Sequence, residues 1–166
     1  GESFILNNSG FSTRLSTAIY GNVMNSTGSL IPLIWSAIKN KITLTLYEEN
    51  MTRFMISANE AVDIIGIALG LKNVNVIPNL KSFRVKDIFG IYAHKFGLKY
   101  TIGQPRVNEK IHEIMASSEE IPRMKYLDDH DCYIMHPFDG GEYSSKNNIV
   151  TCDELTGLLV KEDFYQ

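Results

Sequence analysis

The chain contains an arginine and a glutamate three residues apart whose side chains could hold a nucleotide sugar at two points. They are Arg106 and Glu109, in the run RVNEKIHE. A guanidinium makes bidentate, charge-assisted hydrogen bonds to a diphosphate, and a carboxylate accepts hydrogen bonds from vicinal ribose hydroxyls. The alternative interpretation is a first helical turn whose charges are solvated. The octapeptide by itself is compatible with both interpretations.

Four further segments occur in a fixed order around this pair. They are YGNVM with GSLIP soon after it, MTRF, EYSSKNN and ELTGLL, within residues 20–32, 51–54, 142–148 and 154–159. In this order, the segments resemble the UDP-N-acetylglucosamine 4,6-dehydratases of surface-polysaccharide and flagellin-sugar synthesis, which are extended short-chain dehydrogenases/reductases. The pattern of that family runs roughly RYGNVMxSRGSVIP, MTRF, RPGEKLHE and EYSSxN, followed by a helix with EL-x-x-LL. The resemblance covers about residues 11–164, and its specificity comes from the order of the motifs, because each motif alone is weak.

The resemblance implies an NADP-dependent enzyme that acts on a UDP-N-acetylhexosamine. Such an enzyme oxidises C4 of the sugar and eliminates water across C5 and C6. In the branch that this C-terminus resembles, it also inverts C5. This chemistry requires a G-x-G-x-x-G fingerprint and a Tyr and a Lys four residues apart on a helix, and the chain contains neither. We therefore expect the substrate-binding portion of such an enzyme, without the N-terminal Rossmann half, with no catalytic residue and no NADP binding of its own.

The resemblance also implies which residues contact the substrate. Arg53 and Arg106 are the expected diphosphate ligands, and Glu109 is the expected ligand of the ribose hydroxyls. His112 and Glu113 are expected to orient their loop rather than to touch substrate. The other residues expected at the substrate are Asn22, Leu30, Ile31, Pro32, Leu33, Ile34 and Tyr47, and those expected at the cofactor of the intact enzyme are Tyr20, Asn22 and Val23.

Several of these assignments have a structural alternative. A Gly-Asn pair such as the one that includes Asn22 is often only a turn. Residues 30–34 are also an ordinary helix start, which would bind a ligand largely through backbone groups. Arg53 is also compatible with a role as a surface salt-bridge partner. The residue types alone do not decide between these interpretations.

The chain departs from the family pattern at three positions close to these motifs. Ile19 and Thr27 stand where the family has arginines, and Asn108 stands where it has a glycine. The loss of two cations leaves the exact sugar open. Asparagine adopts a left-handed backbone more readily than most residues, so Asn108 is compatible with the turn that the motif requires.

Size and charge limit the classes of protein to which the chain can belong. A chain of 166 residues with 44% hydrophobic content can bury one core. A net charge of −3 gives no electrostatic basis for binding nucleic acid. No apolar run approaches the roughly 20 residues that cross a bilayer, and no signal-peptide pattern is present. We therefore expect a cytoplasmic protein with no nucleic-acid or membrane partner.

The cysteines and histidines do not predict a disulfide or a metal site. Cys132 and Cys152 are 20 residues apart and form no CxxC motif, which favours two reduced thiols. His130 stands among three aspartates, but their spacing matches no pattern of metal ligands. A polar loop is the expected structure of that segment.

The periodicity of apolar residues predicts an alternating α/β fold. Strands are expected at residues 15–20, 43–47, 74–77, 99–102 and 133–135. Helices are expected after Ser29, from Ser57 with a Ser57–Glu60 capping box, over residues 85–96 up to Gly97, and over 152–161. The apolar faces of the first two helices are expected to contain Leu33, Ile34 and Ile38, and Ala61, Ile64, Ile65, Ala68 and Leu69 respectively.

We expect three consecutive parts along the chain. Residues 1–25 would be the tail of the nucleotide-binding domain, 26–116 the substrate-binding domain, and 117–166 a C-terminal extension. The extension is polar, so its apolar residues are expected to dock onto something else. The resemblance suggests a neighbouring subunit of a homo-oligomer, held by a latch, or the nucleotide-binding half; the alternative is an extension folded back on its own domain. These apolar anchors are Tyr133, Ile134, Met135, Leu155, Leu158, Leu159 and Phe164.

Two other functions are compatible with the sequence. One is a UDP-sugar epimerase or ketoreductase of the same superfamily, although the ending at residues 142–159 is more specific to the dehydratases. The other is a non-catalytic module that binds nucleotide sugars or serves assembly. It differs from the first two because it requires no hydride carrier and no acid–base residues.

Overall fold

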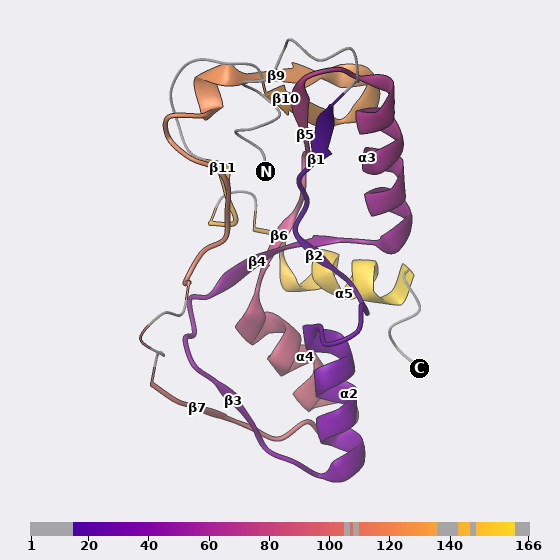
Figure 1. Ribbon diagram of the computed structural model, residues 1–166. Helices are drawn as coiled ribbons and strands as arrows, with labels where there is room; N and C mark the ends of the chain where they lie inside the picture. The colour runs from indigo at the N-terminus through magenta and orange to yellow at the C-terminus, as the bar shows by residue number, and fades with distance from the viewer. Residues whose placement is uncertain (1–14, 105–106, 108–109, 136–142, 147–148, 162–166) are drawn as a thin grey trace. The chain divides into compact units, whose positions relative to one another are not determined.

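The computed structural model describes residues 15–104, 107, 110–135, 143–146 and 149–161 (Figure 1). The fold is mixed α/β and divides into two compact units, each assembled from three stretches of chain. Unit 1 contains the described residues up to Gly21, then Ile56–Leu80 and the described part of Ile114–Ser144. Unit 2 contains Asn22–Met55 and the described parts of Lys81–Glu113 and Ser145–Gln166. The boundaries expected after residues 25 and 116 therefore do not coincide with those of the compact units.

Unit 1 is built on a four-stranded sheet with the order β1-β5-β10-β9. Its strands are β1 (Ser16–Ala18), β5 (Val74–Pro78), β10 (Cys132–Met135) and β9 (Met124–Leu127). β1 runs parallel to β5, with Thr17 opposite Asn75, and the other two pairs are antiparallel. Every residue of β5 is buried, as expected for a strand that is covered on both faces of the sheet.

Two apolar clusters cover the two faces of β5. Helix α3 (Ala58–Gly70) contacts β1 and β5, and its Ile64 and Ala68 pack with Val74 and Val76. On the opposite face Ile77 packs in a second cluster. Close to this second cluster, β8 (Ile114–Ala116) pairs with β11 (Tyr143–Ser144), and two 3-10 turns, η1 (Ile121–Arg123) and η2 (Asp128–His130), flank β9.

Unit 2 contains three helices and two small sheets. The helices are α2 (Leu30–Asn40), α4 (Val85–Phe96) and α5 (Cys152–Lys161). The sheets are β2-β4-β6 (Asn22–Val23, Thr52–Ile56 and Ser82–Arg84) and the parallel pair β3-β7 (Leu44–Leu46 and Tyr100–Ile102).

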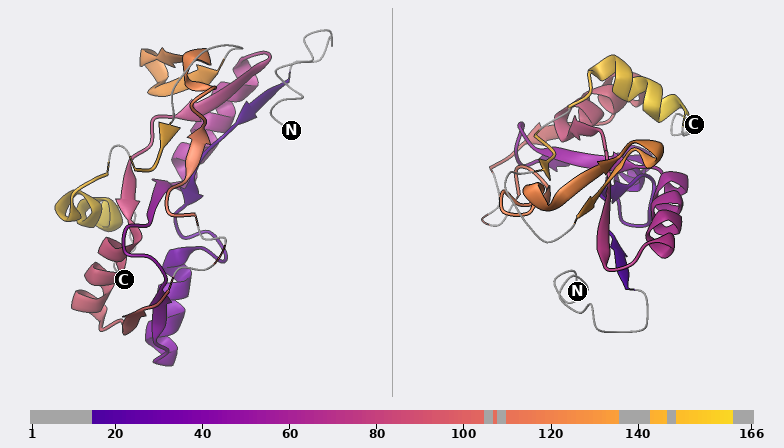
Figure 2. Two further views of the ribbon diagram at one scale, coloured as in Figure 1. Left: turned by 90° about the vertical axis from the view of Figure 1, so that its left-hand side faces the viewer. Right: turned by 90° about the horizontal axis from the view of Figure 1, so that it is seen from above.

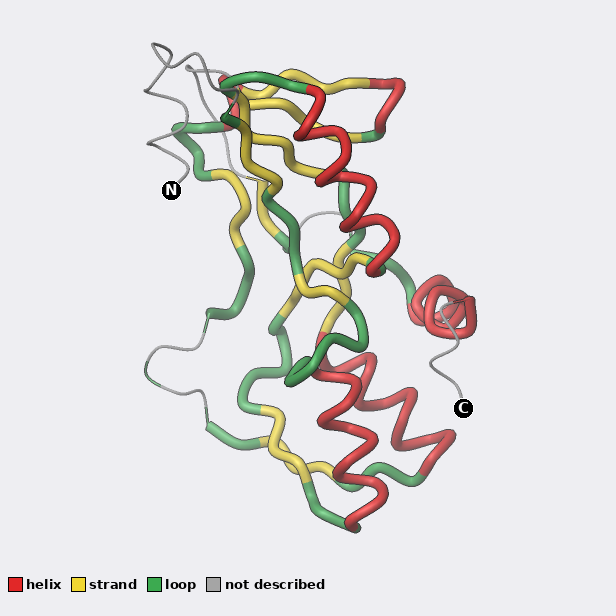
Figure 3. The backbone as a smooth tube through the Cα atoms, turned by 45° about the vertical axis from the view of Figure 1, so that its right-hand side comes forward, coloured by secondary structure: helices red, strands yellow, loops and turns green. Residues whose placement is uncertain are grey.

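The core of unit 2 lies where its helices meet. Helices α2 and α4 lie side by side (Figures 1 and 3), and the rings of Trp35 and Tyr92 are 5.5 Å apart in an edge-to-face arrangement that is favourable for aromatic pairs. Helix α5 contacts α4 (Figure 2) and adds Leu155 and Leu159, both 0% exposed, to the same core. The unit therefore buries residues from both ends of its sequence in one cluster.

The local signals in the sequence locate several elements correctly. The Ser57–Glu60 capping box is present, since Ser57 Oγ accepts from the Glu60 N–H (3.2 Å) and a Glu60 carboxylate oxygen accepts from the Ser57 N–H (2.8 Å). Helix α4 ends at Gly97, whose φ of 69° is left-handed. Helix α5 spans the expected residues. Strands were not predicted at β4 or β6, which have no clear alternation of apolar and polar residues.

Three apolar residues do not lie on the faces predicted for them. Leu33 is 53% exposed, because α2 packs through Ile31, Ile34 and Ala37. Ile65 and Leu69 are 42% and 76% exposed. Helix α3 packs on the sheet through residues at other angular positions, and apolar character alone does not reveal which side of a helix faces the core. Ser29 holds the N-cap position of α2 as predicted, but its side chain makes no capping hydrogen bond.

The described apolar anchors of the C-terminal extension pack on other parts of the same chain, as in the fold-back alternative, and the latch across an assembly stays a prediction. Strand β10 pairs with β5, which leaves Ile134 and Met135 8% and 1% exposed. Leu155 and Leu159 are buried in the core of unit 2. Phe164 lies outside the described residues.

Both cysteines lie in the described part of the chain as free thiols. Cys132 is a buried free thiol of β10 and Cys152 an exposed free thiol of α5. Desolvation raises the pKa of both thiols, with smaller contributions from neighbouring carboxylates. No described helix combines the length and the apolar character needed to cross a bilayer.

We predict that Ser57→Ala lowers the free energy of unfolding by about 1 kcal/mol, because the Glu60 N–H loses its acceptor. Urea denaturation followed by circular dichroism measures the change. Ser118→Ala, at an exposed serine, is the matched control and should leave the midpoint unchanged. Equal midpoints for all three proteins would show that the cap contributes nothing.

Candidate functional site

Strand β4 carries the MTRF motif and holds the loop that ends in the RVNEKIHE motif. The Thr52 N–H donates to the carbonyl of Ile111 at 2.9 Å. On its other side, the Val85 N–H at the start of α4 donates to the carbonyl of Met51 at 2.9 Å. Backbone hydrogen bonds therefore hold this segment to its neighbours on both sides, and the bond between Thr52 and Ile111 aligns the loop with β4.

A buried hydrogen-bond network joins the two motifs to a third one. Thr52 Oγ1 lies 2.7 Å from His112 Nδ1 and 2.7 Å from Ser145 Oγ. The Glu113 N–H donates to Ser145 Oγ at 2.8 Å, and the Ser145 N–H donates to the Glu113 carbonyl at 2.9 Å. Thr52 is 1% exposed and Ser145 0% exposed. Residues separated by as many as 93 positions thus form one polar cluster in unit 2.

The hydroxyl groups of this cluster have more than one partner each. Ser145 Oγ also lies 3.1 Å from the carbonyl of Thr52, to which it can donate. Between Thr52 and Ser145 either hydroxyl can be the donor, and the tautomer of His112 sets whether Nδ1 donates to Thr52 Oγ1 or accepts from it. The prediction that His112 and Glu113 orient the loop is consistent with these contacts.

Arg53 is held within the same region. Its NH1 donates to the carbonyls of Thr52 (2.7 Å) and Ile111 (3.2 Å), and its Nε lies 3.4 Å from a carboxylate oxygen of Glu113. The Arg53 side chain is 14% exposed and that of Glu113 34%. The salt-bridge alternative for Arg53 is therefore present in the structure. The expected ligands Arg106 and Glu109 lie outside the described residues.

Four of the predicted ligands line one small hollow in unit 2, with a volume of about 30 Å³. Asn22 and Val23 approach it from β2, and Leu30 and Ile31 from the start of α2. The hollow has room for only about one or two waters. Its other lining residues are Met24, Asn25, Ser29, Met55, Phe83 and Ile88.

The remaining predicted ligands have different surroundings. Ile34 is 0% exposed in the core, so its side chain does not reach a ligand, whereas Pro32 is half-buried and Leu33 exposed. Tyr47 is half-buried just after β3. Tyr20 belongs to unit 1 and is 38% exposed.

Gly103 is a site residue that the sequence analysis missed. It follows β7, and its N–H donates to the carbonyl of Leu46 at 2.9 Å. A Cβ at this position would lie 2.6 Å from Thr45 Cγ2 and 3.5 Å from the Tyr47 ring. A side chain at position 103 would therefore require Thr45 to shift. The position of Gly103 directly after a predicted strand was the available signal.

Thr52 and Ser145 were also not predicted as site residues. Both lie inside motifs that were recognised, MTRF and EYSSKNN. Nothing local in either motif indicates that the two hydroxyls meet. The RVNEKIHE, MTRF and EYSSKNN motifs are brought together through these uncharged residues.

A family model described as polysaccharide biosynthesis protein matches residues 3–135. The chain therefore belongs to the polysaccharide biosynthesis protein family, a group of extended short-chain dehydrogenases/reductases that modify sugars. Membership of this superfamily confirms the broader part of the resemblance stated above.

Individual relatives are longer than this chain. An uncharacterized membrane protein of Methanocaldococcus jannaschii is 34% identical over 162 residues, which cover 90% of this chain and 47% of that protein. The UDP-glucose 4-epimerase of Rickettsia bellii is 34% identical over 151 residues, covering 87% and 42%. That of Rickettsia prowazekii is 32% identical over 151 residues, covering 89% and 43%. The chain spans less than half the length of these relatives.

A solved structure has the same fold. The X-ray structure of Pen from Bacillus thuringiensis matches with a TM-score of 0.86 at 23% identity, over 99% of this chain and 55% of that chain. The chain thus has the fold of part of an extended short-chain dehydrogenase/reductase, as predicted. At this identity the likeness describes the fold alone.

We predict that Ser145→Ala lowers the free energy of unfolding by about 1–3 kcal/mol, because the buried Glu113 N–H loses its acceptor. The matched control is Ser144→Ala. Ser144 is equally buried, but its Oγ has no hydrogen-bond partner among the described residues, so its loss should change stability by less than about 1 kcal/mol. Urea unfolding measures both variants. Equal losses would mean that burial of the side chain, and not the network, determines the effect.

Proposed function

We propose that this chain is the UDP-sugar-binding part of an NADP-dependent UDP-N-acetylglucosamine 4,6-dehydratase that acts in the cytoplasm. The reaction oxidises C4, removes water across C5 and C6, returns the hydride to C6 and inverts C5, in the synthesis of surface polysaccharide or another glycan. The observation that carries the proposal is the buried network of Thr52, Glu113 and Ser145. It joins three motifs of the dehydratase pattern, and their common role would be to fix the loop that bears Arg106.

In this proposal the loop supplies the main substrate contacts. Arg106 binds the diphosphate, and Glu109 accepts hydrogen bonds from the ribose hydroxyls. Both residues precede His112 and Glu113. The bond of His112 to Thr52 of β4 and the bond of the Glu113 N–H to Ser145 anchor the end of the loop. Arg53 is the second expected diphosphate ligand. Since Arg53 is paired with Glu113, it would have to exchange that carboxylate for the diphosphate.

The start of α2 and the residue after β3 would bind the uridine. Leu30 and Ile31 lie in the first helical turn, where backbone N–H groups have no acceptor within the helix. Such groups suit the carbonyl and phosphate oxygens of a nucleotide. The buried side chains of Ile31 and Ile34 would only hold the helix in place, and Tyr47 would contact the base or the ribose. These contacts orient the sugar without taking part in the chemistry.

The described residues do not fit a complete NADP site. Asn22 and Val23 border a hollow of only about 30 Å³, and the sequence contains no G-x-G-x-x-G loop for the cofactor's phosphates. Contact of Tyr20, Asn22 and Val23 with the cofactor is proposed for the intact enzyme only.

A second candidate function is a UDP-sugar 4-epimerase. It is favoured by the relatives of 32–34% identity that are named UDP-glucose 4-epimerase. Dehydratase and epimerase would share the nucleotide contacts, and they differ in whether water is lost from the sugar. The product therefore separates the two functions.

The experiment uses the intact parent protein with NADP, supplied in turn with UDP-N-acetylglucosamine and UDP-glucose. Dehydratase activity predicts loss of one water from UDP-N-acetylglucosamine, detected by mass spectrometry, with solvent deuterium entering at C5. Epimerised UDP-glucose without any loss of water would replace the dehydratase by the epimerase. The 166-residue chain alone is expected to turn over neither compound, and turnover by the chain would contradict the assignment of its role to binding.

We predict that Arg106→Ala in the intact enzyme raises KM about tenfold or more, since each charge-assisted bond is worth about 1.5–3 kcal/mol. Lys110→Ala, in the exposed part of the same loop, is the matched control. Steady-state kinetics and a thermal melt are measured on both variants. A lower melting temperature with an unchanged KM would show that Arg106 is structural.

A further inference from the structure

Arg53 and Glu113 form an ion pair in which the two side chains are held in different ways. The Arg53 guanidinium is oriented by main-chain atoms, because one of its terminal nitrogens donates to the carbonyls of Thr52 (2.7 Å) and Ile111 (3.2 Å). These bonds keep the direction of the guanidinium independent of the carboxylate. The Arg53 side chain is 14% exposed, so it is not closed off from solvent.

The Glu113 carboxylate is attached less firmly than its own main chain. Two bonds to Ser145 fix the main chain, one from the Glu113 N–H (2.8 Å) and one to the Glu113 carbonyl (2.9 Å). The side chain is 34% exposed, and a carboxylate oxygen lies 3.4 Å from Arg53 Nε. A charge-assisted bond between nitrogen and oxygen usually measures about 2.7–2.9 Å. The contact is thus a long ion pair, which can break while the loop stays in place.

The guanidinium of Arg53 requires an anion beside it. Its side chain is mostly buried, and a buried charge that lacks a counter-charge is unfavourable. In this structure the counter-charge is the single carboxylate of Glu113. A diphosphate carries more negative charge and offers oxygens for a bidentate contact, which is shorter and stronger. The protein therefore supplies a weaker partner for Arg53 than a nucleoside diphosphate would.

We propose that the Glu113 carboxylate is a built-in competitor of the substrate, which neutralises Arg53 in the free protein and is displaced when the diphosphate of a nucleotide sugar binds. The inference rests on the proposed function, which takes Arg53 as a diphosphate ligand. Glu113 itself makes no bond to the substrate. It lowers the affinity of the site, because the ion pair must break and the displaced carboxylate then repels the bound diphosphate.

The displaced carboxylate affects the product as well as the substrate. In the proposed reaction only the sugar changes, so the product keeps the same diphosphate. The Glu113 main chain stays bonded to Ser145 and keeps the carboxylate close to Arg53, so that it competes at a high effective concentration. Its return to Arg53 assists release of the product, the step that limits the rate of many enzymes.

The test measures the Kd of the 166-residue chain for UDP by isothermal titration calorimetry. Glu113→Gln keeps the main-chain bonds to Ser145 and removes the charge that competes for Arg53. It should lower Kd at least about threefold, a difference of about 0.7 kcal/mol and within the range of partly exposed ion pairs. Damage to the fold would raise Kd, so a merely structural role of Glu113 does not produce this result.

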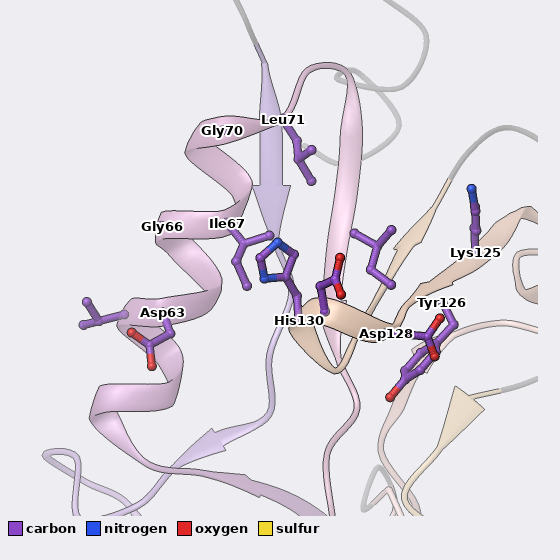
Figure 4. Close-up of a pocket in the computed structure, with 12 residues that line it drawn as sticks. Asp63, Gly66, Ile67, Gly70, Leu71, Lys125, Tyr126, Asp128 and His130 are labelled. Atoms are coloured by element: carbon purple, nitrogen blue, oxygen red, sulfur yellow. The ribbon is translucent and has the colours of Figure 1, made fainter.

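Two control variants remove a carboxylate elsewhere, and both should leave Kd unchanged. Glu49→Gln breaks the ion pair of Glu49 with Lys86, and the Glu49 side chain is similarly exposed at 39%. Asp63→Asn removes an exposed carboxylate of α3, which lines the open groove between α3 and the end of β9 in unit 1 (Figure 4). An equal gain of affinity in the controls and in Glu113→Gln would assign the effect to net charge and overturn the inference.

A double-mutant cycle shows whether Glu113 acts through Arg53. Arg53→Ala should raise Kd at least about tenfold, since it removes charge-assisted bonds. In the Arg53→Ala background, Glu113→Gln should no longer lower Kd, because the guanidinium for which it competes is absent. A gain of the same size in both backgrounds would show that the carboxylate only repels UDP, and would overturn the inference.

The outcomes separate this inference from the proposed function. If Arg53→Ala weakens UDP binding and Glu113→Gln leaves Kd unchanged or raises it, Glu113 is not a competitor, while the binding role of the chain stands. An unchanged Kd with Arg53→Ala would show that Arg53 is not a ligand, which also overturns the inference. If the wild-type chain shows no saturable binding of UDP at millimolar concentration, the proposed function and the inference are both refuted.

Discussion

The hydrogen bonds around Thr52 are the interaction on which the arrangement of unit 2 depends. Thr52 and Ser145 are buried hydroxyls, and an unpaired polar group in such a place costs about 1–3 kcal/mol. Each of their bonds therefore requires the correct partner from a distant part of the chain. Strand β4, the segment of His112 and Glu113, and the segment of Ser145 can satisfy one another only when all three are in place.

This interdependence explains how a polar and irregular loop is held by a small unit. The apolar core of unit 2 fixes its helices, but it does not reach the loop of Glu113, which is half-buried. The polar network extends the ordered region from the core to the loop. Arg53 continues the same chain of contacts toward the surface through Glu113 and the carbonyl of Ile111. The ion pair of Arg53 with Glu113 and the buried hydroxyls of Thr52 and Ser145 thus hold the same loop.

The sequence predicts those structural elements that interactions between neighbouring residues determine. The capping box at Ser57, the left-handed stop at Gly97 and the full extent of α5 depend on neighbouring residues, and each was located correctly. The pairing of β4 with β6 and the meeting of Thr52 with Ser145 depend on residues far away in the chain. Hydrophobic periodicity contains no information about such partners.

The C-terminal extension shows the same limit in another form. Its few apolar residues correctly indicate that it cannot form a core of its own. They do not indicate which body it joins, and the structure distributes them over both units of the same chain, Met135 to unit 1 and Leu159 to unit 2. For the candidate site, the motifs identified the correct segments, while the uncharged residues that join them were apparent only from their contacts.

The wrong assignment of Ile65 and Leu69 of α3 to the core has a physical explanation. Ile65 and Leu69 were assigned to the core because they are apolar at helical spacing, yet they are exposed beside Gly66 and Gly70. The amphipathic rule assumes that the face away from the core meets water. On α3 both faces are apolar, so the rule cannot distinguish them. One apolar side of α3 is packed on β1 and β5, whereas the apolar residues Ile65 and Leu69 on another side are exposed in the described part of the chain.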